Sequence, residues 1–367
     1  MSEAERPLYC ERVRAEYLKI REAYLHGEAG KSRLALEEAR ANRFKIAWAD
    51  YAPPTPKLAG TRALIGYDLA ELVPYIDWTP FFSTWELAGK YPHIFADRAV
   101  GAEAKRLYAD AQAMLERLIE EKWLSAHAVI GIWPANAVGD DIELYADATR
   151  ATRIGVLHTL RQQMMRSNRR DRANTALADF IAPKASGLAD FIGAFALTAG
   201  IGEEAALNSR IALSDDYGRI MLKALADRLA EAFAEHLHLR VRREFWAYAA
   251  DETLDAEALI AEKYRGIRPA PGYPAQPDHT EKATIFRLLD AEAKAGIRLT
   301  ESFAMWPAAA VSGLYISHPQ SHYFGVGKVE RDQVADYALR KGWSVAEAER
   351  WLAPVLNYEP RPARSAA

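Results

Sequence analysis

One long apolar stripe constrains this chain more than any other feature of its sequence. Between Asp216 and Trp246, apolar side chains recur at every fourth position, which is the spacing of one face of an α-helix. The stripe consists of Met221, Leu225, Leu229, Phe233, Leu237 and Val241. Charged residues stand between these positions, and we expect them to form a polar, solvent-facing side. They are Asp227, Arg228, Glu231, Glu235, Arg240 and Arg242. The pattern predicts a long helix with one face against a core.

Shorter helical and extended segments alternate along the rest of the chain. The run from Ala189 to Thr198 is apolar, ends near glycines and is too short for a second long helix, so it predicts a central strand. Helical spacing predicts further helices near 62–74, 100–122, 331–342 and 344–353. Strands rich in β-branched and aromatic residues are expected at 127–132, 310–317 and 323–330. The predicted fold class is therefore α+β.

The N-terminal part reads as an arm joined to a compact body. Residues 8–41 predict two exposed helices with a break near Gly27 to Lys31. The proline-rich stretch Tyr51 to Pro56 prevents helix continuation and favours extended backbone. We therefore expect a helical arm or linker over 1–44, one compact domain over 45–358, and a flexible tail over 359–367.

Composition excludes several classes of function. The formal net charge is only -3 over 367 residues, so no global attraction to nucleic acid or to an anionic membrane is expected. Cys10 is the single cysteine, which excludes an internal disulfide and a cysteine-rich zinc centre. No apolar run approaches the ~18 residues of a membrane span, and the first residues are acidic and polar, so a cytoplasmic location is expected.

The common cofactor signatures are missing from the sequence. It contains no Gly-x-Gly-x-x-Gly fingerprint, no phosphate-binding Gly-x-x-x-x-Gly-Lys-Ser/Thr loop and no His-Glu-x-x-His pair. His236 and His238 are two positions apart and point to different faces of a helix. We therefore expect no metal site.

A rigid loop with one cation is the best candidate for a binding site. The segment Gly266 to Pro274 holds three prolines, two glycines and Arg268 within nine residues. A guanidinium suits a carboxylate, and neighbouring glycines let a flat ligand approach the backbone, so a small amino-acid or nucleoside ligand is favoured. A purely structural proline turn is the alternative reading.

Several segments together resemble a known family. The sequence Arg268-Pro-Ala-Pro-Gly272-Tyr273 is similar to the Arg-x-x-x-Gly-Tyr motif of the S-adenosylmethionine-binding activation domain of cobalamin-dependent methionine synthase. Four other segments resemble that family in the same order. They are Asp77 to Phe82, Leu87 to Pro92, Pro134 to Glu143 and Glu301 to Pro307. The resemblance spans about residues 40–358.

The resemblance implies a fold and a set of ligand contacts. The implied fold is a C-shaped α+β unit with a central bent antiparallel sheet flanked by helices, which binds S-adenosylmethionine in a shallow groove. The implied contacts fall on Asp77, Glu231, Arg268, Gly272, Tyr273 and Tyr323, with the backbone of Ala270 nearby. The family often has a second tyrosine after Tyr323, whereas this chain has Phe324. Loss of that hydroxyl would lower affinity if it touches the ligand.

Each implied contact has a chemical role and an ordinary structural alternative. S-adenosylmethionine carries a sulfonium, an ammonium and a carboxylate, so we expect Asp77 to accept from the ammonium and Arg268 to bind the carboxylate. Tyr323 would donate to the same carboxylate, and Glu231 would lie near the sulfonium or ribose. Alternatively, Asp77 is a helix N-cap, Glu231 is a solvated residue of the long helix, and the tyrosines are core rings.

The resemblance also implies partners. Since the chain lacks the Asp-x-His-x-x-Gly motif that supplies histidine to cobalamin, we expect cobalamin to be held by a partner domain of methionine synthase. A flavodoxin-type electron donor would supply the electron for reactivation. The alternatives are a non-catalytic docking module that binds S-adenosylmethionine and a self-sufficient methyltransferase. A basic cluster would receive an acidic redox partner, or would simply be a solvated loop. It comprises Arg161, Arg166, Arg169, Arg170 and Arg172.

Overall fold

The protein is described here by a computed structural model covering residues 6–29, 32–165 and 173–360, and it divides into two compact units. The larger unit contains Ile46–Leu160 and Ala176–Gly325. The smaller unit contains the chain up to Lys45, the segment 161–175 and the chain from Val326 onward. The domain predicted over 45–358 therefore groups segments from both units.

An antiparallel sheet forms the centre of the larger unit. Within the described residues it has six strands in the order β4-β3-β2-β5-β8, and β1 also pairs with β2. All of these pairs are antiparallel. The strands are β1 (Gly60–Tyr67), β2 (Ser125–Val138), β3 (Asp141–Tyr145), β4 (Arg153–His158), β5 (Asp190–Ile201) and β8 (Ala310–Tyr315). A separate two-stranded ribbon joins β6 (Arg298–Leu299) and β7 (Met305–Trp306). The prediction of an α+β fold with a central sheet is confirmed.

The long strand β2 organises this sheet. One of its edges pairs first with β1 and then with β3, whereas β5 pairs along the other edge from Ser125 to Ala135. Strand β5 has β2 on one side and β8 on the other. Most side chains of β2 and β5 are buried, which explains their nearly continuous apolar sequences. The predicted central strand is thus confirmed.

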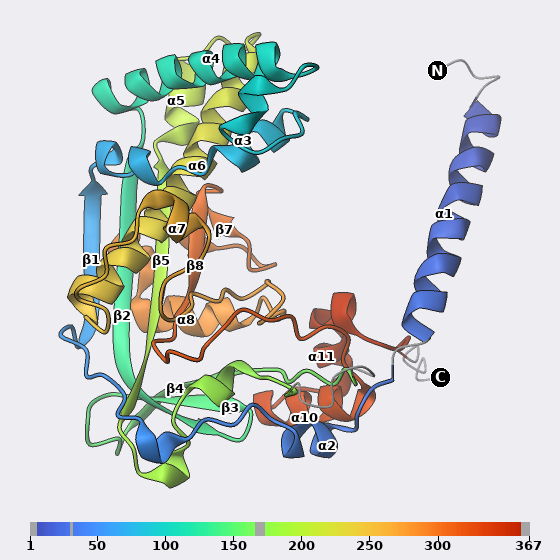
Figure 1. The fold of residues 1–367 in the computed structure, drawn as a ribbon, viewed down its shortest axis with the longest axis vertical. Coiled ribbons are helices and arrows are strands. Elements are labelled where there is room, and N and C mark those ends of the chain that lie inside the picture. The colour runs from blue at the N-terminus through green and yellow to red at the C-terminus, as the bar shows by residue number, and fades with distance from the viewer. Residues whose placement is uncertain (1–5, 30–31, 166–172, 361–367) are drawn as a thin grey trace. The chain divides into compact units, whose positions relative to one another are not determined.

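Helices cover the larger unit, and α6 is the longest of those in it that the structure describes. They are α3 (Trp78–Thr84), α4 (Gly101–Glu120), α5 (Glu203–Ser209), α6 (Asp216–Arg240), α7 (Ala256–Ile260), α8 (Glu281–Leu289) and α9 (Ala291–Ala295). Figure 1 shows α3, α4, α5 and α6 gathered beyond one end of the sheet. The apolar stripe of α6 packs in one core with Leu107, Leu115 and Leu118 of α4. The predicted helices at 100–122 and from Asp216 are confirmed.

The expected solvent-facing side of α6 is only partly correct. Glu235 is 7% exposed, and Arg242, in the π-helical turn Val241–Phe245 that follows α6, is fully buried. The helix also packs against β5 and β8, so part of its second face is covered by the sheet. Arg242 is compensated by Glu252, whose carboxylate accepts from its Nε and Nη2 at 2.8–3.0 Å.

Two predicted elements are wrong. The expected helix at 62–74 is strand β1 followed by two short 3-10 turns, because Gly60–Tyr67 pairs with β2 and this pairing overrides local propensity. The expected strand at 323–330 is irregular apart from a single bridge between Val329 and Leu356. Gly327 has φ +73°, which interrupts an extended run.

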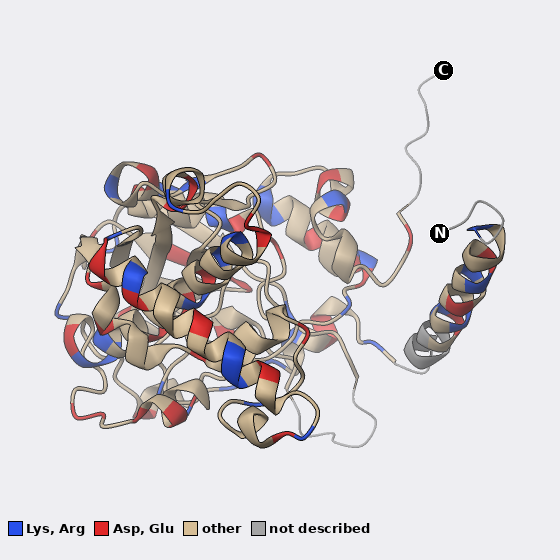
Figure 2. Ribbon diagram, turned by 90° about the horizontal axis from the view of Figure 1, so that it is seen from above, with Lys and Arg blue, Asp and Glu red and all other residues tan. Residues whose placement is uncertain are grey.

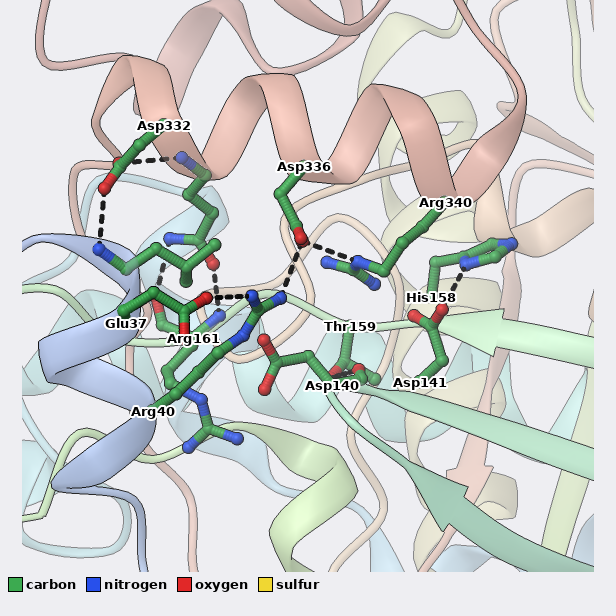
Figure 3. A network of polar contacts seen from close by, with 12 residues as sticks. Glu37, Arg40, Asp140, Asp141, His158, Thr159, Arg161, Asp332, Asp336 and Arg340 are labelled. Atoms are coloured by element: carbon green, nitrogen blue, oxygen red, sulfur yellow. Dashed lines mark hydrogen bonds and ion pairs between the residues drawn. The ribbon is translucent and has the colours of Figure 1, made fainter.

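The smaller unit is helical. Its helices are α1 (Arg6–Ala29), α2 (Leu36–Ala41), α10 (Arg331–Lys341) and α11 (Val345–Trp351). Two predicted helices near the N-terminus and two near the C-terminus are thus confirmed, but α2 is not exposed all round because Leu36 and Ala39 are buried. Figure 3 shows α2 beside α10, where Asp336 accepts from both Arg40 and Arg340 at 2.8 Å. From residue 361 on, the predicted tail lies outside the described residues.

Surface charge and helix hydropathy agree with the composition. Figure 2 shows positive and negative residues interspersed along the same helices. No helix among the described residues has both the length and the apolar character needed to cross a membrane. Arg161 of the predicted basic cluster is buried, and its Nη1 donates to the carbonyl of Asn174 at 2.7 Å, so it is not a surface cation. The other four arginines of that cluster lie outside the described residues.

Candidate functional site

The loop that carries Arg268 is fixed to strand β8 and its continuation. Gly266 adopts φ +84°, and Ile267 then exchanges both backbone hydrogen bonds with Ile316 at 3.0 Å. The carbonyl of Pro269 accepts from the N–H of Leu314 at 2.8 Å. These bonds hold the backbone on both sides of Arg268, so the side chain starts from a fixed point.

The same loop then closes on itself. The N–H of Gly272 donates to the carbonyl of Gln276 at 2.7 Å, and the N–H of Tyr273 donates to that of Ala270 at 3.1 Å. Gly272 has φ +97°, a conformation that glycine adopts without strain. The turn leaves Tyr273 60% exposed and presents its ring at the surface.

A pocket of about 490 Å³ lies against this loop. That volume is within the range of sites for small molecules. Four predicted contacts and the predicted backbone position of Ala270 belong to the segments around it, and Phe324 lines it too. The lining residues are Phe195, Glu231, Glu262, Arg268, Pro269, Ala270, Tyr273, Pro274, Ala275, Val311, Tyr323 and Phe324. Gly272 lies within the lining loop without itself being a lining residue.

Arg268 brings a paired cation to the pocket. Its Nη2 donates to Glu235 Oε2 at 2.7 Å, and its Nη1 donates to the hydroxyl of Tyr264 at 2.9 Å. Burial alone would lower the pKa of Arg268, but Glu235 together with Tyr264 and Tyr323 outweighs this effect and raises the pKa. The guanidinium therefore stays charged. Its acidic partner is Glu235, which the sequence placed on the polar side of the long helix.

Two carboxylates face the same pocket. Glu231 lies one helical turn before Glu235 on α6, and Glu262 follows α7. Burial raises the pKa of both carboxyl groups, and Arg268 partly offsets this increase. Glu231 is exposed at the pocket surface, so it is not a core residue, and its alternative reading as a solvated residue of the long helix predicts the same exposure. A cationic ligand group would find negative charge here.

Tyr323 supports the loop as well as lining the pocket. Its hydroxyl accepts from the backbone N–H of Arg268 at 3.0 Å and lies 3.4 Å from the hydroxyl of Tyr264. The ring is 38% exposed, so Tyr323 is not a core residue. Its hydroxyl proton remains available for a ligand or for Tyr264.

Asp77 caps a helix, as its alternative reading states. Its Oδ1 accepts from the N–H of Thr79 at 2.9 Å at the start of α3. It is not among the lining residues of the pocket in the described structure. The segment before it nevertheless contacts α6, since the rings of Tyr75 and His236 lie 4.6 Å apart. Asp77 is half-buried, and its Oδ2 makes no hydrogen bond within the described residues.

Sequence reasoning missed Glu235 and Tyr264. A signal for Glu235 exists, because alanines recur beside the apolar stripe of α6 at positions 226, 230 and 234. Small residues on a second face indicate that this face is also packed, and an acid within it needs a partner. Tyr264 has no comparable signal, since its role depends on where the loop returns.

The site carries charges for an organic ligand. Within residues 6–29, 32–165 and 173–360, no group of three or more His, Cys, Asp or Glu side chains is placed to hold a metal ion. The described pocket instead combines one guanidinium, two carboxylates, two tyrosines and an apolar floor that includes Phe195 and Val311. This set matches a ligand with both charges and a flat apolar part.

Comparison with known proteins identifies the family. Residues 68–342, more than half of the chain, match the family model described as "Vitamin B12 dependent methionine synthase, activation domain". The chain is also similar to the solved structure "Crystal Structure of the MetH Reactivation Domain bound to AdoHcy", with 56% identity and a TM-score of 0.86. The match covers 89% of this chain and 99% of that one. This chain therefore belongs to the family of activation domains of vitamin B12 dependent methionine synthase.

Proposed function

We propose that this chain binds S-adenosylmethionine in the pocket beside the Arg268 loop and presents its methyl group to cob(I)alamin held by a partner domain. The observation that carries the proposal is the arrangement of charge. A fixed guanidinium and two carboxylates, Glu231 and Glu262, line one pocket of about 490 Å³. The ligand named for the solved relative, AdoHcy, is the demethylated form of the same methyl donor.

The charges of the ligand suggest which groups receive it. We assign the ligand carboxylate to Arg268 and Tyr323, and the sulfonium side to Glu231. Gly272 and Ala270 would offer close backbone approach, and Tyr273 would cover the ligand. We assign the ammonium to Asp77, since its Oδ2 makes no hydrogen bond among the described residues and its segment contacts α6.

The proposed chemistry asks this chain for positioning rather than proton transfer. When the methyl group leaves a sulfonium, the leaving group departs as a neutral thioether, so neither a general acid nor a general base is required. Cobalamin on the partner domain supplies the nucleophile. The residues of this chain bind the donor, orient its methyl group and match its charges. We therefore propose no catalytic residue.

The proposal names two partners. The first is the cobalamin-binding domain of methionine synthase, on the same or a separate chain, without which we expect the module to be inactive. The second is a flavodoxin-type electron donor. The membership of this chain in the activation-domain family supports the first partner.

Calorimetry on one arginine variant tests the binding site. We expect Arg268→Ala to weaken S-adenosylhomocysteine binding by about 10- to 100-fold, because it removes charge-assisted hydrogen bonds to a carboxylate. Arg106→Ala is the matched control, since Arg106 is an exposed arginine that pairs with Glu103 on α4. Melting temperatures of both variants check folding. Unchanged affinity in Arg268→Ala would refute the site.

An assay with and without the cobalamin domain distinguishes the proposed function from its two alternatives. We expect methyl transfer from S-adenosylmethionine only when the reduced cobalamin domain is present. Turnover of a small-molecule acceptor without that domain would favour a self-sufficient methyltransferase. Binding of S-adenosylmethionine without transfer to reduced cobalamin would favour a docking module.

A further inference from the structure

Glu235 is a buried acid at the back of the pocket that the predicted contacts do not include. Its side chain is 9% exposed, and its Oε2 accepts from Arg268 Nη2 at 2.7 Å. Its Oε1 has no hydrogen-bond partner within the described residues. It lies on α6 one turn after Glu231, which lines the pocket.

The burial of the Glu235 carboxylate carries an energetic cost that a partner must offset. Removing an ionised carboxylate from water costs several kcal/mol unless a partner compensates it. Arg268 is that partner, and its own side chain is only 19% exposed. Arg268 offsets the cost of burying the carboxylate, and the 2.7 Å contact fixes the position of both side chains.

The remaining contacts of Arg268 lie around the same end of its guanidinium. Nη1 donates to Tyr264 and lies 3.4 Å from Nδ1 of His238. Burial, reinforced by Arg242 and Arg268, lowers the pKa of His238 well below its ordinary value, so the ring is neutral and Nδ1 can accept. Nε2 of the same ring lies 3.3 Å from the hydroxyl of Tyr248.

These contacts leave one edge of the guanidinium available. Within the described residues, Nε and the second proton of Nη2 make no hydrogen bond. A guanidinium binds a carboxylate most strongly through two parallel N–H donors, and Nε with Nη2 form such a pair. The protein thus occupies Nη1 and one N–H of Nη2, and it leaves Nε and the other N–H of Nη2 for a ligand carboxylate.

We infer that Glu235 is a positioning residue, which holds the guanidinium of Arg268 in the orientation that receives the ligand carboxylate. It acts through Arg268 and does not touch the ligand. This inference rests on the proposed function, because it assumes that Arg268 binds the carboxylate of the methyl donor. It predicts that Glu235 matters only for ligands that carry that carboxylate.

A comparison of two ligands by calorimetry tests the inference. S-adenosylhomocysteine has the amino-acid carboxylate, whereas 5′-methylthioadenosine lacks the amino-acid group. We expect Glu235→Ala to weaken the binding of S-adenosylhomocysteine by about tenfold or more, since Arg268 loses the hydrogen bond that orients it. The affinity for 5′-methylthioadenosine should stay within about threefold of wild type. A general loss of structure would weaken both ligands alike.

Two conservative variants keep the test decisive if the alanine variant does not fold. Glu235→Gln retains an acceptor at the same reach, so we expect S-adenosylhomocysteine affinity within about threefold of wild type. Glu235→Asp keeps the charge but withdraws the carboxylate by one methylene, so we expect weaker binding than with Gln. Glu244→Ala is the control, since Glu244 pairs with Arg240 in an exposed position; it should change neither affinity.

The outcomes distinguish the inference from the proposed function. If the wild-type chain binds S-adenosylhomocysteine but Glu235→Ala binds it equally well, or loses both ligands to the same extent, the inference is wrong. Tighter binding of S-adenosylhomocysteine by Glu235→Asp than by Glu235→Gln would also overturn the inference, because the charge of residue 235 rather than the placement of its acceptor would then decide affinity. Failure of the wild-type chain to bind S-adenosylhomocysteine refutes the proposed function itself.

Discussion

At the scale of single residues, environment decides what each acid of α6 does. Glu231 and Glu235 are one helical turn apart and chemically identical, yet only Glu235 has a guanidinium within hydrogen-bond distance. Glu231 stays at the pocket surface, and burial raises its pKa. The same side chain thus serves as a support in one position and as a titratable pocket charge in the other.

The titration of Glu231 predicts a pH dependence of ligand binding. Because its pKa is raised, Glu231 takes up a proton at a higher pH than a free glutamate does, and its attraction for a cation is then lost. We expect affinity for S-adenosylmethionine to be lower at about pH 5 than at about pH 7, and affinity for the neutral thioether S-adenosylhomocysteine to fall less.

The variant Glu231→Gln separates the contribution of Glu231 to this pH dependence from that of Glu262, whose pKa is also raised. Calorimetry on Glu231→Gln should show weak binding of S-adenosylmethionine at both pH values, with a smaller difference between them. If both ligands show the same pH dependence in the wild-type chain, Glu231 does not face the sulfonium.

At the scale of elements, the Arg268 loop depends on a glycine. Gly266 has φ +84°, and a Cβ there would lie 2.6 Å from the carbonyl oxygen of Ile316 and 2.7 Å from the hydroxyl of Tyr248. That carbonyl already accepts from Ile267, and Tyr248 is buried, so neither neighbour can move cheaply. The start of the loop is therefore fixed by shape.

Gly266→Ala should destabilise the fold and displace Arg268. We expect the free energy of unfolding to fall by about 3 kcal/mol, from left-handed backbone strain plus the clash, with weaker S-adenosylhomocysteine binding. Gly187→Ala is the matched control, because Gly187 has φ +70° but an added Cβ would meet no atom within 4 Å. It should cost only about 1 kcal/mol. Urea unfolding measures both, and equal losses would show that the clash is absent.

At the scale of the whole molecule, the buried histidine His318 contributes to the response of stability to acid. His318 is buried against Tyr51 and Trp48, with ring centroids 4.4 and 5.1 Å away. Burial, with a smaller contribution from Arg265, lowers the pKa of His318 from 6.5 to about 4. The unfolded chain therefore binds a proton more readily than the folded one between these two values.

This difference predicts acid destabilisation. The contribution of His318 to the free energy of unfolding is fully present above pH 6.5, and about 3 kcal/mol of it is lost as the pH falls to about 4. Urea unfolding across that range should show a flatter profile for His318→Gln than for the wild type. The control His93→Gln, at an exposed site, should keep the wild-type slope. Parallel profiles for wild type and His318→Gln would contradict the prediction.

The sequence by itself determined the elements whose signals are local. The four-residue repeat of Met221 to Val241 predicted α6, the apolar run from Ala189 predicted β5, and the glycines and prolines around Arg268 predicted a fixed loop. Several motifs in one order also predicted the family, which the family model confirms. Such signals are readable because each depends on neighbours within one element.

Only the tertiary structure decided what each element meets. Residues 60–67 became a strand because β2 offers a free edge to them, and Glu235 became buried because α6 also packs against β5 and β8. The partner of Arg268 followed from that packing. These outcomes depend on contacts between segments far apart in the chain. A periodic pattern indicates which face of an element is apolar, but it does not indicate which distant segment covers the other face.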